Sequence, residues 1–294
     1  MSTVHTHYDS SSKIGSVFHY GKECLTNRWK PLLILAICFI LIPRIISGYS
    51  FALSSKTLVD AIRNGSLSDG NLIMKLESLL SEHGMATALG INFLAFILAL
   101  VGLLAISQMC LDYFEQNPTK SVLQCAKSGG RVLLLKGFGA AAAMVLLVAP
   151  MAIFALLRVI LLCLLTMLPL EMVGGHRGGF GSVTNTIFLR YAALTKAGRW
   201  PAFSNVMTFG GLALSAVLLY QLGLGYLLQI DVNLGILSSW WVDEVSILGS
   251  QVSISYLVVH TLELLGDTAA LTISMPFFAS LRFHAQKSSF SIKT

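Results

Sequence analysis

Long apolar runs dominate the pattern of hydrophobic and polar positions along the chain. Six of them are long enough for a helix that crosses about 30 Å of hydrocarbon, which takes about 20 residues. The runs are continuous, so they lack the period-two alternation typical of membrane barrel strands. The pattern predicts an all-α, polytopic membrane helical bundle with six transmembrane helices, at about 31–53, 85–111, 132–149, 151–173, 202–228 and 251–281.

The third and fourth spans lie in one apolar stretch, 132–173, which is too long for a single crossing. Pro150 divides it, because proline has no amide hydrogen and cannot continue the hydrogen bonding of a helix interior. We therefore expect a tight hairpin that turns at Pro150. One long kinked helix is the alternative interpretation.

The composition agrees with a membrane protein. Charged residues make up 12% of the chain, against roughly 25% in a soluble protein. The hydrophobic fraction is 55% and the mean hydropathy is +0.74. These values exclude a soluble globular enzyme, a disordered chain, a collagen and a small secreted domain held by disulfides.

The distribution of basic residues predicts the orientation. With six spans, fifteen of the twenty Lys and Arg residues fall on one side, in four segments: Lys13, Lys22, Arg28 and Lys30; Lys120, Lys127, Arg131 and Lys136; Arg177, Arg190, Lys196 and Arg199; and Arg282, Lys287 and Lys293. Cytoplasmic loops carry such an excess. We therefore expect a multi-pass protein of the bacterial inner (plasma) membrane with both termini in the cytoplasm.

The domain organisation follows from the same pattern. We expect a disordered tail at 1–14, a single membrane domain at 15–281 and a cytoplasmic tail at 282–294. The outer loop at 54–84 has apolar residues at helical spacing and an acidic face, which favours two short amphipathic helices on the outer side.

Three cytoplasmic stretches resemble one another, at 15–35, 120–135 and 181–203. Each begins with Ser-Val, continues with mixed apolar and basic residues, and leads through a basic residue into a span. This pattern predicts interfacial amphipathic helices and a threefold internal repeat of one such helix plus two spans. Three independent basic flanks are the alternative interpretation.

The order of these elements resembles the YciC-like bacterial inner-membrane proteins and the membrane domain attached to some glycerophosphodiester phosphodiesterases. The resemblance rests on the helix at 15–30, on KSVLQCAKSGGRVLLL at 120–135, on the hairpin around Pro150 and on the stretch at 181–200. It covers most of the chain from residue 15. The long outer loop at 54–84 and Trp240-Trp241 depart from the family pattern. The resemblance implies a fold plan and no activity.

Ionisable groups inside spans are the first candidates for function, because burying them in lipid is costly. The five candidates are Arg44, Arg158, His260, Glu263 and Asp267. The last three share one helix face, at spacings of three and four residues.

These five groups lie in the outer half of the bilayer by sequence arithmetic. We expect Glu263 to pair with Arg44 or Arg158, because an unpaired charge there would cost several kcal/mol. An ion pair that fixes helix packing, a proton- or substrate-coupling site, and snorkelling toward the interface remain open. His260, Glu263 and Asp267 lack a clear fourth donor, so we expect neither a metal nor a cofactor.

The glycine-rich segment VGGHRGGFGS at 173–182 carries His176 and Arg177. Its interpretations are a flexible connector and a phosphate or lipid-headgroup contact through backbone amides and these two side chains. It lacks the GxxxxGK[ST] pattern and follows no strand.

No catalytic constellation is visible in the sequence, so we expect a non-enzymatic protein that acts in envelope or lipid organisation or as a component of a membrane complex. A small-solute or ion-coupled transporter with Glu263 and Asp267 at a mid-membrane site is the first alternative, and a lipid-modifying enzyme is the second. The expected partners are anionic lipid headgroups of the inner leaflet and a second copy or another membrane protein. Nucleic acid is not expected.

Overall fold

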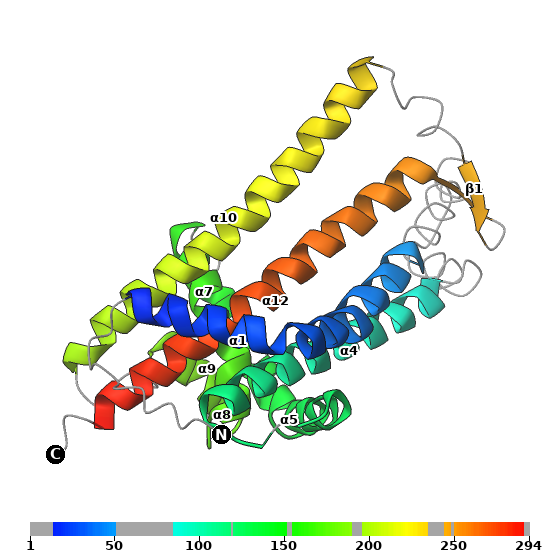
Figure 1. Cartoon of the computed structure of the whole chain (residues 1–294). Coiled ribbons are helices and arrows are strands. Elements are labelled where there is room, and N and C mark those ends of the chain that lie inside the picture. Colours follow the sequence, from blue (N-terminus) through cyan, green and yellow to red (C-terminus); the bar gives the residue numbers. More distant parts are fainter. Residues whose placement is uncertain are drawn as a thin grey trace. The chain divides into compact units, whose positions relative to one another are not determined.

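The computed structural model describes residues 14–50, 85–118, 120–151, 155–189, 196–234, 244–247 and 250–290. Apart from one short hairpin, the elements are helices (Figure 1). Five described helices are long and apolar enough to cross a membrane, and they are Gly15–Ser50, Thr87–Phe114, Val122–Val148, Phe203–Tyr226 and Val258–Ala285. An all-α membrane bundle is therefore confirmed. The outer loop at 54–84 and nearly all of the tail at 1–14 lie outside the described residues.

The first span begins earlier than the sequence suggests. Helix α1 (Ile14–Leu35) passes without a break into a π-helical segment, η1 (Ala36–Leu41), and residues 42–50 are helical again. A separate interfacial helix at 15–30 is thus replaced by the first turns of one long helix. Val17, Cys24 and Leu32 are buried along one side of it, so the packed face continues directly into the apolar run.

Helices α4 (Met85–Phe114) and α5 (Val122–Ala143) are joined by a short connector. Gln116 in this connector has a positive φ of 56°, the left-handed conformation that often ends a helix. Ser121 then begins α5 with a capping box, in which its side chain accepts from the amide of Gln124 and the Gln124 side chain accepts from the Ser121 amide. The basic stretch at 120–135 is therefore continuous with the third span.

The expected turn at Pro150 needs correction. After α5 the helix continues as the π segment η2 (Met144–Val148) and as α6 (Ala149–Met151), so Pro150 lies within a helix. The chain then forms α7 (Ala155–Leu165) and α8 (Leu168–Gly174), which do return beside α5. The Lys136 ammonium in α5 donates hydrogen bonds to the carbonyls of Met172 and Gly175 at the end of α8.

The fourth predicted span is thus two short helices, α7 and α8, joined by a turn. Their apolar part, Val159–Gly174, is shorter than the five helices that could cross a membrane. Pro150 does not form the turn, because it lies in α6, and α8 returns beside α5; residues 152–154 lie outside the described residues. A π segment widens the helix by one residue, so it can relieve the clash that proline makes with the preceding turn.

The first and third spans share this device. Helices α1 and α5 each run directly into a π segment. Each π segment ends two residues before a proline, Pro43 in one case and Pro150 in the other. This likeness supports the predicted internal repeat for its first two copies. In the third, the short helix α9 (Gly179–Ile187) is separate from α10 (Lys196–Leu234).

The remaining elements follow α10. Strands β1 (Glu244–Ile247) and β2 (Ser250–Ser253) form an antiparallel hairpin in which Glu244 pairs with Ser253. Helix α12 (Ile254–Phe290) continues well past residue 281, so Arg282 belongs to a helix and not to a tail.

The chain divides into two compact units. Unit 1 contains Met1–Leu33, Leu104–Leu214 and Leu271–Thr294, and unit 2 contains Ile34–Leu103 and Ser215–Ala270. Unit 1 has a hydrophobic core made by Leu104, Ala140, Ala143, Val148, Leu161, Met172 and Val183. Within it α5 and α9 approach closely, because a Cβ on Gly179 would overlap the carbonyl oxygen of Lys136 and one on Gly139 would lie 3.2 Å from the amide nitrogen of Phe180.

Unit 2 also uses glycines for close packing. Gly102 in α4 lies against Phe39 and Ile40 of η1, and Gly266 in α12 lies against the ring of Tyr220 in α10. The Tyr220 hydroxyl donates to the carbonyl of Leu262 at 2.7 Å. Small residues that let backbones approach are a common means of joining helices in membranes.

Candidate functional site

Three of the five predicted intramembrane groups lie in one part of unit 2. Arg44 Nη2 lies 3.7 Å from Asp267 Oδ2, and these side chains are 34% and 26% exposed. The pairing differs in detail from the expectation, since Arg44 meets Asp267 instead of Glu263, one helical turn away on the same face. At 3.7 Å the contact is an ion pair that is too long for a charge-assisted hydrogen bond.

His260 belongs to the same region. Its ring packs on Tyr49 with 6.4 Å between ring centroids, and Gly48 leaves the space that the imidazole occupies. The hydroxyls of Tyr49 and Thr261 lie 2.6 Å apart. Two residues before Tyr49, Ser47 donates to the side-chain oxygen of Asn92. Polar side chains from residues 42–50, α4 and α12 therefore face one another in unit 2.

Asp267 is the least satisfied member of this group. Its Oδ1 atom is buried and accepts no hydrogen bond from any residue that the structure describes. An unpartnered buried acceptor costs about 1–3 kcal/mol, and more when it is charged. Such a group is therefore a candidate for proton or solute chemistry.

The other two predicted groups are not placed against a partner. Glu263 is half-buried in α12. Arg158 lies in α7, but its side chain falls outside the described residues. The expected pairing of Glu263 with Arg158 stays a prediction.

His176 and Arg177 are exposed in the connector between α8 and α9. Arg177 Nη1 donates to the side-chain oxygen of Asn185 at 3.3 Å, so it already has a partner within the chain. The surrounding glycines have packing roles, because a Cβ on Gly174 would lie 2.7 Å from the guanidinium of Arg282. Gly174 and Gly179, the helix residues on either side of this connector, are thus closely packed, and the flexible connector stays a prediction.

The most deeply buried charges are a pair that sequence reasoning missed. Arg282 Nε donates to Glu171 Oε1 at 2.7 Å, and both side chains are 2% exposed. Lys136 lies nearby and binds the carbonyls of Met172 and Gly175, both at 2.6 Å. This cluster ties α12 to the end of α8. The available signal was a carboxylate inside the predicted span 151–173.

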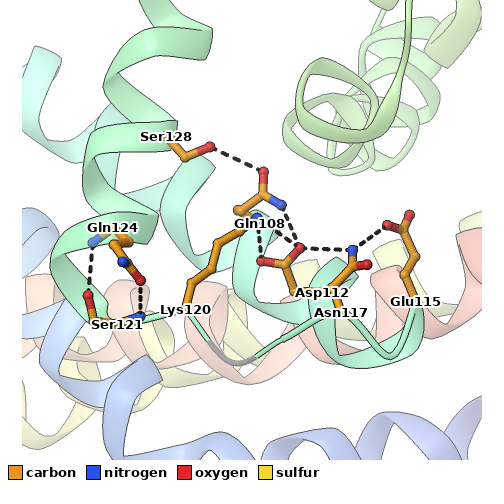
Figure 2. A network of polar contacts seen from close by, with 8 residues as sticks. All are labelled: Gln108, Asp112, Glu115, Asn117, Lys120, Ser121, Gln124 and Ser128. Atoms are coloured by element: carbon orange, nitrogen blue, oxygen red, sulfur yellow. Dashed lines mark hydrogen bonds and ion pairs between the residues drawn. The ribbon is translucent and has the colours of Figure 1, made fainter.

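A second missed centre lies at the junction of α4 and α5 (Figure 2). Asp112 is 5% exposed, and its Oδ1 accepts hydrogen bonds from Gln108 at 2.9 Å, Asn117 at 3.2 Å and Lys120 at 3.1 Å. Its Oδ2 lies 3.0 Å from the Lys120 ammonium. Gln108 also accepts from Ser128, which links the two helices. The network joins the end of α4, the connector and α5.

The described residues offer no group of three or more His, Cys, Asp or Glu side chains arranged to hold a metal ion. Cys24, Cys110 and Cys125 are buried. Buried thiols of this kind behave as small apolar groups.

Known proteins offer no guide to this arrangement. The chain matches no protein family, no curated protein and no solved structure.

Proposed function

We propose that this chain is a non-enzymatic multi-pass protein of the bacterial inner membrane, with cytoplasmic termini, that organises anionic lipids around itself. The observation that carries the proposal is how its charges are divided. The acidic groups buried in unit 1 are engaged by bases of the same chain, Glu171 by Arg282 and Asp112 by Lys120. The exposed charges include several cations beside apolar surface.

Lys22, Lys127 and Arg131 are exposed. They stand close along the chain to exposed apolar side chains such as Phe18, Leu123 and Leu134. A surface of this kind suits the boundary between acyl chains and anionic headgroups, where each Lys or Arg contributes about 1 kcal/mol.

A vesicle experiment tests the proposal. The purified protein is inserted into phosphatidylcholine vesicles that contain a little self-quenching fluorescent phosphatidylglycerol. We expect the protein to increase quenching, because it gathers anionic lipid, and we expect salt to reverse the effect by screening. Unchanged quenching over a range of protein-to-lipid ratios would contradict lipid organisation.

Ion-coupled transport is the second candidate, and Asp267 is the observation that favours it. Its Oδ1 atom is buried beside the Arg44 side chain and accepts no hydrogen bond from the part of the chain that the structure describes. In liposomes that carry a pH-sensitive dye, transport predicts a proton or solute flux that D267N abolishes. E115Q is the matched control, because Glu115 is an exposed carboxylate in the α4–α5 connector. Equal fluxes in wild-type and protein-free liposomes would exclude this candidate.

A further inference from the structure

One face of α5 carries an ordered series of exposed side chains. Going along the helix, the face begins with an apolar residue, continues with two basic residues and ends with apolar residues. The spacings of four, four, three and four residues keep all five within one side of a helix. The members of this α5 cationic face are Leu123, Lys127, Arg131, Leu134 and Phe138.

This face is open in unit 1. Leu123 is 76% exposed, Leu134 is 86% exposed and Phe138 is 89% exposed. The side of α5 that packs inward is a different one, where Lys136 and Gly139 meet the start of α9. Nothing described in unit 1 covers the exposed series.

The two cations on this face lack partners. Lys127 and Arg131 are exposed and make no hydrogen bond or ion pair with any residue that the structure describes. They stand four residues apart, where like charges on a helix repel each other. An anion placed between them would remove this repulsion.

The chemistry of the two cations indicates which anion fits. An arginine guanidinium presents two parallel N–H groups to phosphate oxygens, and a lysine ammonium adds a point charge. One turn further along, Leu134 and Phe138 offer apolar surface at the level where acyl chains begin. A ligand that matches both parts has an anionic phosphate joined to an acyl chain.

We infer that the α5 cationic face binds an anionic phospholipid, with its headgroup phosphate between Lys127 and Arg131 and an acyl chain along Leu134 and Phe138. The inference rests on the proposed lipid-organising function and gives it a defined site. The basic side chains select the headgroup, and the apolar side chains hold the lipid at the membrane boundary.

Lipid retention in native mass spectrometry tests this site. The protein is extracted from bilayers of equal parts phosphatidylglycerol and phosphatidylcholine, and the bound lipids are counted. Wild type should retain phosphatidylglycerol preferentially. The double variant K127Q/R131Q should lose this preference by roughly 10- to 30-fold, as expected for two removed lipid-facing cations. R131K should lose part of it, because the two-pronged phosphate contact is gone.

The matched control is K22Q/K30Q. It removes the same charge from α1, where the two lysines stand eight residues apart, about 12 Å along the helix, so they are too far apart to hold one phosphate between them. Retention by the control together with loss in the α5 variant supports the site. Equal loss in both variants overturns the site and leaves general lipid organisation in place. No preference in wild type overturns the site and the proposed function together.

Folding does not confuse the result, because Lys127 and Arg131 are exposed and their replacement should leave the melting temperature of the protein unchanged. Binding of inorganic phosphate in place of the lipid is a further outcome. If added phosphate displaces phosphatidylglycerol from wild type where sodium chloride of the same ionic strength does not, the site takes free phosphate and the inference fails.

Discussion

At the scale of single residues, the Glu171–Arg282 pair shows how buried charge is tolerated in unit 1. The two side chains are almost completely buried and are joined by a 2.7 Å hydrogen bond. Each charge can be buried because the other one neutralises it. Replacing both by apolar groups is often neutral, whereas removing one partner leaves an unpaired charge in a medium of low polarity.

The expected result of E171Q is therefore a strongly destabilised protein. Arg282 keeps its charge but loses its counter-ion, which costs about 3–5 kcal/mol for a buried pair. The double variant E171L/R282M should recover most of this loss. Apparent melting temperatures in detergent measure both, with E115Q as a control on an exposed carboxylate. An E171Q protein as stable as wild type would show that Glu171 and Arg282 do not form a buried ion pair in the membrane.

The sequence predicted part of this picture. Arg44, His260 and Asp267 could be named because uncharged runs surround them and because the spacing on one helix face is fixed by helix geometry. The choice of Asp267 over Glu263 as partner of Arg44 depends on the axial offset between two helices, which periodicity does not contain. Arg282 was assigned to a tail because its burial depends on contacts with α8, more than a hundred residues away in the chain.

At the scale of elements, glycines have opposite effects according to what lies beside them. Gly179 faces the backbone of Lys136 without room for a Cβ, whereas a Cβ on Gly130 in α5 would meet nothing within 4 Å. The first glycine makes the α5–α9 contact, and the second only weakens its helix.

These two positions give a prediction of opposite sign. G179A should lower the melting temperature, because overpacking against a rigid backbone typically costs about 1–3 kcal/mol. G130A should raise it, by about 0.5–1 kcal/mol of stability, since alanine favours the helix. The two variants carry the same chemical change, so a shift of the same sign in both would contradict the assigned packing.

The apolar runs predicted the long helices, and proline predicted where their hydrogen bonding is disturbed. The sequence did not predict the form of the disturbance at Pro150. The hydrogen bond that proline removes can be accommodated either by a π segment or by a break in the helix. Which of the two forms depends on the neighbouring helices.

At the scale of the whole molecule, the topology depends on how often the chain crosses the membrane. Among the described residues, five helices satisfy length and hydropathy, and α7 and α8 return the chain beside α5. If that return is the sixth passage, the basic segments all face one side, as the distribution of Lys and Arg predicts.

Fusion reporters test this topology. Green fluorescent protein joined to the C-terminus should fluoresce, because that reporter folds in the cytoplasm, and a single cysteine at position 64 should react with an impermeant maleimide added outside. A C-terminal reporter active only on the outer side would require an odd number of passages and would contradict the proposed orientation.

The π segments before Pro43 and Pro150 also set how the chain tolerates changes in length. Each holds one residue beyond what a regular helix would need, so losing one residue there restores an α-helix and keeps both flanking faces aligned. The same loss elsewhere in these helices would rotate everything downstream by about 100° and turn lipid-facing residues toward protein. At these two short stretches, therefore, a span of this protein can lose one residue while its lipid-facing and protein-facing sides keep their orientation.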